Sequence, residues 1–222
     1  MSVEDIDILY EDNHLLAVNK PPGMLSVGDD TGDASAFDLA AHYLKVKYNK
    51  PGNVFVGVVH RLDRPVSGVL LFARTSKAAS RLSDQFRRRS VRKRYLAVVE
   101  GRAAEGVQEL EDCLAKDERT NTVSVVGRGD RRGKVSRLTY ECLRTHAGQS
   151  LLQVEPLTGR SHQIRVQLAS RDLPIVGDVK YGARQGLGHR ILLHAAELHV
   201  DHPTQKHRLA IAADCPFDEQ AR

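Results

Sequence analysis

The sequence predicts an α+β protein built on a mixed, mostly antiparallel sheet flanked by helices and loops. Short alternating segments dominate the middle of the chain, which is typical of hairpins in an antiparallel sheet. Two longer segments, Ser35–Tyr48 and Ser76–Arg89, carry apolar residues at helical spacings. No repeat, low-complexity tract or Ser/Gly-rich linker divides the 222 residues, so we expect one domain, residues 1–222.

Local signals indicate where these elements begin and end. Pro21-Pro22-Gly23 fits a type II turn, because proline fixes a negative φ and glycine tolerates a positive one. Ser35 is a candidate cap for the first helix, and Thr158 and Ser161 are candidate caps for a third. The third helix is predicted over Ser161–Arg171, and the predicted strands are Ile6–Tyr10, His14–Asn19, Gly68–Ala73, Arg94–Glu100, Val107–Leu114, Thr122–Val126, Lys134–Arg144, Ser150–Glu155, Ile191–Val200 and His207–Ala212.

The composition excludes several classes of protein. Apolar runs are broken well before the roughly 18 residues that a membrane helix needs, and the acidic start of the chain is unlike a secretory signal. The cysteines Cys113, Cys142 and Cys215 are too few and too scattered for a disulfide framework or a metal motif. We therefore expect a cytoplasmic protein with no membrane partner.

Charge is distributed unevenly along the chain, although the net charge is only +5. The first twelve residues hold five acids, whereas Arg87–Arg94 holds six cations in eight positions. A second basic cluster, Arg128–Lys134, lies among glycines and predicts a hairpin or loop. One basic run is usually a solvated face, but two runs together with further Arg-rich motifs indicate an anionic partner such as a nucleic acid.

The segment Val58–Gly68 has the pattern of a loop that holds catalytic side chains between buried strands. If the backbone is extended, Arg61 and Asp63 point the same way, one toward a substrate phosphate or base and the other toward the reacting atom. The alternative is that Asp63 only turns the chain before Arg64-Pro65, with Arg61 as its local ion-pair partner.

Two further segments carry candidate functional side chains. Arg160 and His162 lie at the expected start of the third helix, where positive charge opposes the helix dipole and so favours a role with a ligand. Arg165 lies among apolar neighbours and needs a carboxylate partner, which in the alternative view is merely a structural acid. Tyr95 directly follows the basic run and offers a ring on which a flipped base can stack, although most strand tyrosines simply pack in a core.

These segments together resemble the RluA-type branch of RNA pseudouridine synthases. The family hallmarks H-R-L-D-x-x-[TS]-S-G, K-x-Y-x-A-x-V-x-G and T-G-R-x-H-Q-[IL]-R match His60–Gly68, Lys93–Gly101 and Thr158–Arg165. Val66 stands where threonine is usual, and Gln167 stands where the family often has histidine. Further matches are Tyr10–Gly23, Ile175–Gly182 and Leu193–Leu198, so the resemblance covers almost the whole chain.

The resemblance implies conversion of uridine to pseudouridine within RNA, with no metal or organic cofactor. It implies that Asp63 is catalytic, by attack on C1′, addition to C6 or abstraction of the C2′ proton, and these alternatives stay open. It implies that Arg165 pairs with this aspartate, that Tyr95 stacks on the target base, and that Arg61 fills the gap left by the flipped nucleotide. The other predicted RNA contacts are His60, Arg64, Arg88, Arg92, Lys93, Arg160 and His162.

The expected partner is a ribosomal or transfer RNA stem-loop, and we expect a monomer without the S4-type domain of many relatives. A catalytically silent RNA-binding module is the competing hypothesis, but it has no need for Asp63, Tyr95 and Arg165 together. A metal-dependent hydrolase is disfavoured because the histidine spacings fit neither a helical pair nor a zinc finger. These histidines are His189, His194, His199, His202 and His207.

Overall fold

The computed structural model describes residues 6–29 and 31–217, so the acids Glu4 and Asp5 lie outside the described residues. Its α-helices and β-strands confirm the predicted α+β class. The chain divides into two compact units, the first made of Met1–Arg92 with Ala195–Asp214 and the second of Lys93–His194 with Cys215–Arg222. Within the described residues, no helix is long and apolar enough to cross a bilayer.

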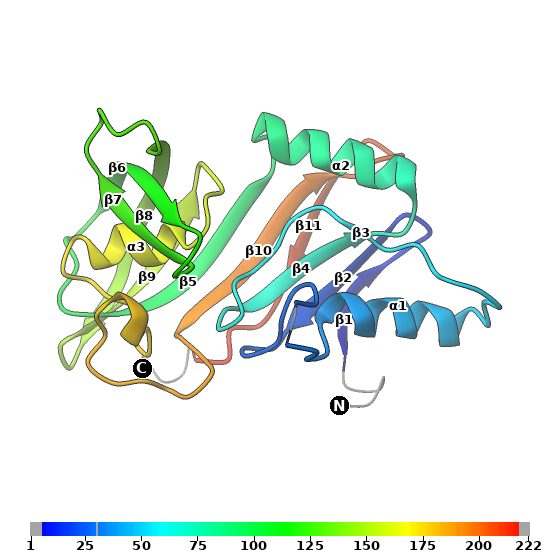
Figure 1. The fold of residues 1–222 in the computed structure, drawn as a ribbon, viewed down its shortest axis with the longest axis horizontal. Helices are drawn as coiled ribbons and strands as arrows, with labels where there is room; N and C mark the ends of the chain where they lie inside the picture. Colours follow the sequence, from blue (N-terminus) through cyan, green and yellow to red (C-terminus); the bar gives the residue numbers. More distant parts are fainter. Residues whose placement is uncertain (1–5, 30, 218–222) are drawn as a thin grey trace. The chain divides into compact units, whose positions relative to one another are not determined.

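The first unit holds a sheet in the order β1-β2-β4-β10, with β3 paired to β4 and β11 paired to β10 (Figure 1). Helix α2 packs on β4, and α1 is bonded to β1 by Tyr43 and Lys47, which both donate to Glu11. The elements of this unit are β1 (Asp7–Glu11), β2 (Leu15–Lys20), α1 (Ala36–Lys47), β3 (Gly57–Val58), β4 (Ser67–Ala73), α2 (Ser76–Arg88), β10 (Leu193–Asp201) and β11 (Arg208–Ala212).

The core of the first unit lies where α2 covers the sheet. All seven residues of β4 are buried, and Leu71 packs with Ala78 and Leu82 of α2 in one apolar cluster. Gly68 allows β4 to lie against β10, because its φ is +113° and an added Cβ would lie 2.3 Å from the carbonyl oxygen of Ala195. A side chain at this position would therefore separate two central strands.

Both helices of the first unit begin as their sequences predict. Ser35 caps α1 in a capping box, since its hydroxyl accepts from the Asp38 amide and Asp38 accepts from the Ser35 amide. Thr75 caps α2, and Arg89 ends it in the left-handed conformation. The predicted ends of the two helices agree with the structure because the signals that determine them are local in sequence.

The second unit holds antiparallel strands in the order β5-β9-β8-β6-β7, in which β5 pairs with β9 and β6 pairs with β8. Most of the basic cluster Arg128–Lys134 lies in the connection between β7 and β8, as the glycines predicted, and Lys134 is the first residue of β8. The elements are β5 (Arg92–Glu100), β6 (Val107–Asp117), β7 (Thr122–Val126), β8 (Lys134–His146), β9 (Gln149–Pro156), α3 (Gln163–Ala169) and the 3₁₀ helix η2 (Val179–Tyr181).

The prediction for the third helix is wrong in its length and its cap. α3 covers only Gln163–Ala169, and its N-cap is His162 in the left-handed conformation with no side-chain cap. Thr158 does not cap the helix, because its hydroxyl accepts from the Arg137 amide and donates to the Gln163 side chain. Gln167 also has a structural role here, since it is fully buried and donates to Asp112.

Candidate active-site loop and arginine cluster

The loop that carries Asp63 lies in the first unit between β3 and β4, and it is held on both sides of the carboxylate. Before it, the Ser26 hydroxyl donates to the Leu62 carbonyl (2.8 Å) and accepts from the Leu62 amide (3.0 Å). After it, the Val66 amide donates to the Asp63 carbonyl (3.0 Å), which closes a turn. Asp63 is itself half-buried, so a rigid backbone presents a carboxylate that solvent still reaches.

Lys20 also fixes this loop, although no role was assigned to it from the sequence. It is fully buried at the end of β2, and its ammonium donates to the carbonyls of Pro21 (3.0 Å), Met24 (2.8 Å) and Arg64 (3.2 Å). Burial lowers the pKa of Lys20 from 10.5 to about 7, although the carboxylate of Asp63 acts in the opposite direction. The lysine that braces the Asp63 loop therefore has a pKa close to neutrality.

The Pro21-Pro22-Gly23 turn is joined to the same loop. Gly23 has a φ of +85°, as the predicted type II turn requires. Its amide donates to the Arg64 carbonyl (2.8 Å), and the Arg64 Nε donates back to the Gly23 carbonyl (3.0 Å). Arg64 also pairs with the exposed Asp33 at 2.6 Å. A predicted RNA contact is thus also a brace for the backbone next to Asp63.

His60 and Arg61 differ in their environment although they are neighbours. The His60 Nε2 accepts from the Leu71 amide of β4 (2.9 Å), and its ring stacks on Phe86 of α2 with centroids 4.9 Å apart. This nitrogen is therefore committed to the protein, and the predicted RNA contact of His60 stays a prediction. Arg61 is exposed, as a side chain that enters an RNA stack must be.

In the second unit, Arg165 has the buried carboxylate that the sequence required, and this acid is Asp178. The guanidinium makes a bidentate pair with it, Nε to Oδ2 at 2.7 Å and the terminal nitrogen to Oδ1 at 2.8 Å. Both side chains are almost fully buried. Arg165 and Asp63 belong to different units, so the pairing between them that the resemblance implies stays a prediction.

Tyr181 completes the support for Arg165. Its ring lies under the Arg165 guanidinium, whose central carbon is 4.9 Å from the ring centroid. Its hydroxyl accepts from the Val123 amide (3.0 Å). His162 contacts the same hydroxyl through Nδ1 at 2.6 Å. Arg160 is exposed beside this cluster, with its amide donating to the Gln163 side chain. The arrangement holds Arg165 in one orientation within its unit.

Tyr95 and the basic run lie at the start of β5 and the end of α2. Tyr95 is half-buried and pairs in register with Val154 of β9. Burial lowers the pKa of Lys93 to about 8, and its ammonium lies beside Gly159 of the Arg160 segment. Arg88 is exposed and pairs with Asp84 at 2.6 Å, while Arg92 is exposed. Most cations of the run therefore face solvent. Both predictions for the run, a solvated face and an RNA-binding surface, require this.

The histidines that suggested a metal hydrolase have different partners, although the rings of His202 and His207 stack with centroids 5.2 Å apart. His194 packs edge-on against Phe217, His199 bonds to Glu197, and His202 bonds to Asp12 at 2.6 Å. Across residues 6–29 and 31–217, no group of three or more His, Cys, Asp or Glu side chains is arranged to hold a metal ion.

Three residues that support the candidate site, Lys20, Asp178 and Tyr181, were assigned no role from the sequence. A signal for Lys20 was present, since a lysine at the end of an apolar strand and next to Pro-Pro-Gly needs buried acceptors. Asp178 and Tyr181 lie within a segment that matches the family, but their spacing alone does not indicate which side chain they contact. The tertiary structure supplies that partner.

The pH dependence of stability tests the environment of Lys20. An unfolded lysine keeps its proton to about pH 10.4, whereas the folded protein releases it near 7, so the unfolded state binds more protons between these values. The free energy of unfolding should therefore rise with pH in this window. We expect the free energy of unfolding of Lys20→Met, measured with urea, to rise less than that of the wild type between about pH 7 and 10. Lys93 remains in both proteins, and equal slopes would contradict the assignment.

Comparison with known proteins identifies the family. The model of the RNA pseudouridylate synthase family matches residues 14–170. The chain is 33% identical over 221 residues to the ribosomal large subunit pseudouridine synthase C of Buchnera aphidicola subsp. Acyrthosiphon pisum (strain APS), covering 96% of this chain and 68% of the relative. It is 36% identical over 222 residues to the protein of the same name from Yersinia pestis, covering 97% of this chain and 67% of that one.

A solved structure has the same fold. The human RNA pseudouridylate synthase domain containing 1 superposes with a TM-score of 0.80 at 29% sequence identity, covering 100% of this chain and 88% of that chain. The chain therefore belongs to the RNA pseudouridylate synthase family. It is an isomerase that modifies RNA, as the resemblance in its motifs implied.

Proposed function

We propose that this enzyme isomerises specific uridines in large-subunit ribosomal RNA to pseudouridine, with Asp63 as the essential carboxylate. The observation that carries the proposal is the Asp63 loop, which Ser26, Lys20 and the Asp63–Val66 turn hold rigid in a chain of this family. The choice of ribosomal RNA rests on the printed names of the bacterial relatives. Because the proposed substrate is ribosomal RNA, we expect the enzyme to be cytoplasmic.

The proposed reaction is a rearrangement that needs no oxidant or reductant. The N1–C1′ bond breaks, the uracil turns, and a C5–C1′ bond forms, while C5 loses a proton and N1 gains one. The carboxylate of Asp63 serves as nucleophile or general base, by attack on C1′, addition to C6 or removal of the C2′ proton. All three routes need an ionised carboxylate held in a fixed place, which the clamped loop supplies.

The remaining side chains act on the flipped nucleotide and on the charge of Asp63. Tyr95 stacks on the extruded uracil, and Arg61 occupies the space that the nucleotide leaves, which together offset the few kcal/mol that unstacking costs. The resemblance implies that Arg165 pairs with Asp63, and the support of Arg165 by Asp178 and Tyr181 favours such a positioning role. We further expect the protein to act as a monomer, which size-exclusion chromatography tests.

Mapping pseudouridines in RNA treated with the purified protein tests the function. Transcripts of large-subunit ribosomal RNA and a mixture of tRNA transcripts are incubated with the enzyme, and carbodiimide-dependent reverse-transcription stops are mapped. We expect new stops at discrete uridines of the ribosomal transcript alone. Stops confined to tRNA would replace the proposed substrate, and stops in neither RNA would favour a silent RNA-binding module.

Neutralising the basic run tests its role in binding. Changing Arg88 and Arg92 to glutamine should weaken RNA binding and lower the slope of log K against log salt by about one for each lost phosphate contact. Filter binding at a series of potassium chloride concentrations measures this slope. A slope equal to that of the wild type would mean that the run is only a solvated face.

A further inference from the structure

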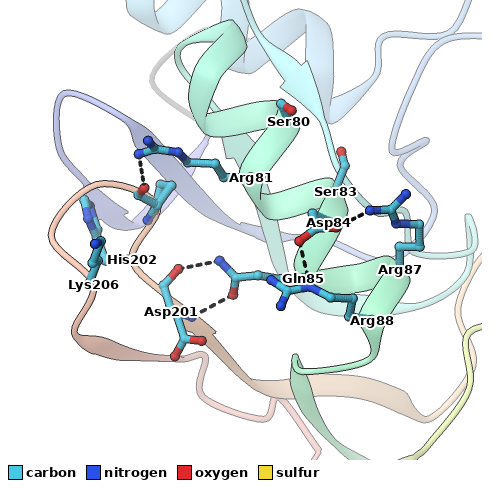
Figure 2. A pocket seen from close by; sticks show the side chains of 11 residues that line it. Ser80, Arg81, Ser83, Asp84, Gln85, Arg87, Arg88, Asp201, His202 and Lys206 are labelled. Carbon is cyan, nitrogen blue, oxygen red and sulfur yellow. Dashed lines mark hydrogen bonds and ion pairs between the residues drawn. The ribbon is translucent and has the colours of Figure 1, made fainter.

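A polar groove lies between α2 and the turn that joins β10 to β11, within the first unit (Figure 2). Its volume is about 810 Å³. Its walls carry four cations against two carboxylates, Asp84 and Asp201, and proline is the one apolar side chain among its described lining residues. The cations are Arg81, Arg87, Arg88 and Lys206.

The two walls of the groove are already locked together. Gln85, which is buried, donates to the Asp201 carbonyl (2.7 Å) and accepts from the Asp201 amide (2.8 Å). Arg81 donates to the Pro203 carbonyl at 2.6 Å. These three bonds, two of which are drawn between Gln85 and Asp201 in Figure 2, fix the spacing of helix and turn. A ligand therefore meets a preformed surface and little ordering cost opposes its binding.

The carboxylates do not remove the positive character of the groove. Asp84 pairs with both Arg87 and Arg88, whose side chains are 79% and 65% exposed. Asp201 pairs with Arg208, which is also exposed. Exposed ion pairs of this kind are weak, so the guanidiniums can exchange a carboxylate for a phosphate at little cost.

The lining chemistry decides which partner fits. Small-molecule sites are mostly apolar, and protein interfaces are centred on buried aromatic or aliphatic anchors, neither of which this groove offers. Exposed guanidinium and ammonium groups with serine hydroxyls between them are what a phosphodiester backbone binds. The groove also shares α2 with the candidate site, because Phe86 of this helix stacks on His60 of the Asp63 loop.

We infer that this groove binds the phosphodiester backbone of the substrate RNA, beyond the nucleotides that reach the Asp63 loop. The inference rests on the proposed function in taking the ligand to be RNA. It extends the RNA-binding surface from the basic run Arg87–Arg94 to Ser83 and Lys206, which no sequence motif indicated.

A double variant, Ser83→Glu with Lys206→Gln, tests the groove while every residue of the basic run Arg87–Arg94 is kept. Both residues are exposed, and a glutamate at position 83 faces Arg87 four residues later and competes with phosphate for it. The probe is large-subunit ribosomal RNA freed of protein. We expect binding weaker by on the order of tenfold at ~0.1 M potassium chloride, with a salt slope smaller by about one.

The control is Lys45→Gln with Lys50→Gln, which changes the net charge by the same amount at exposed positions outside the groove. We expect this control to bind the RNA with the affinity and slope of the wild type. Equal behaviour of the two double variants would overturn the inference. So would a groove variant that loses affinity for poly-L-glutamate but not for the RNA, since the occupant would then be an acidic polypeptide.

The binding readout separates this inference from the proposed function. If the wild type forms pseudouridine in ribosomal RNA but the groove variant keeps the wild-type slope, the groove assignment fails and the function stands. If no pseudouridine forms but the groove variant alone loses affinity and slope, the assignment of the ligand as RNA backbone stands and the proposed reaction fails.

Discussion

Replacing Asp63 with asparagine is expected to lower the rate of pseudouridine formation by at least about 10³-fold, within the range that loss of a catalytic base or nucleophile causes. Asparagine has the same shape but carries no negative charge, so it can neither attack C1′ or C6 nor accept the C2′ proton. Single-turnover assays on large-subunit ribosomal RNA measure the effect. Because the loop is held through backbone atoms of Leu62, Asp63 and Arg64, the variant should fold normally.

Binding and a matched carboxylate separate chemistry from general charge effects. The Asp63→Asn protein should bind the RNA within about threefold of the wild type, since the phosphate contacts lie on other residues. Asp214→Asn removes one exposed carboxylate in the same unit and should keep full activity. Turnover by Asp63→Asn close to that of the wild type would show that another group carries the reaction.

Replacing Asp178 with alanine is expected to destabilise the protein by about 3–5 kcal/mol, the cost of breaking a buried ion pair from one side. The change removes both hydrogen bonds that Asp178 accepts from Arg165 and leaves a guanidinium only about 6% exposed. A buried charge with fewer acceptors favours the unfolded state, in which water solvates it. Urea unfolding at constant pH measures the loss.

Tyr181→Phe is the matched comparison, because it keeps the ring under the guanidinium and removes only the hydroxyl. Loss of its bonds to the Val123 amide and His162 should cost about 1 kcal/mol. A loss below about 1 kcal/mol for Asp178→Ala would mean that the pair contributes little to folding. The support of Arg165 would then rest on the tyrosine alone.

Sequence reasoning succeeded where the determining signals are local. Ser35 caps α1 through a residue three positions away, and Gly23 takes the positive φ of its turn. It failed for α3, because the Thr158 hydroxyl bonds to a strand twenty-one residues away instead of capping the helix. β3 was also missed, since a two-residue strand exists only through its pairing with β4.

In the candidate site, too, local features were predicted from the sequence and contacts between distant residues were not. The loop within Val58–Gly68 and a partial burial of Arg165 were predicted from adjacent residues, and the need of Arg165 for a carboxylate followed from the cost of burying a charge. The identity of that carboxylate, Asp178, did not follow, because thirteen residues separate the pair. Lys20 likewise reaches a carbonyl forty-four residues away.

The sequence by itself determined the family, the Ser35 cap of α1, the type II turn and the basic run, because each depends on residue types at fixed short spacings. Only the tertiary structure decided which buried groups meet: Lys20 with the Asp63 loop, Asp178 with Arg165, and α2 with the β10–β11 turn. Burial makes unpaired polar groups costly, so the fold must provide partners for them, and sequence spacing does not reveal which strand or loop supplies each one.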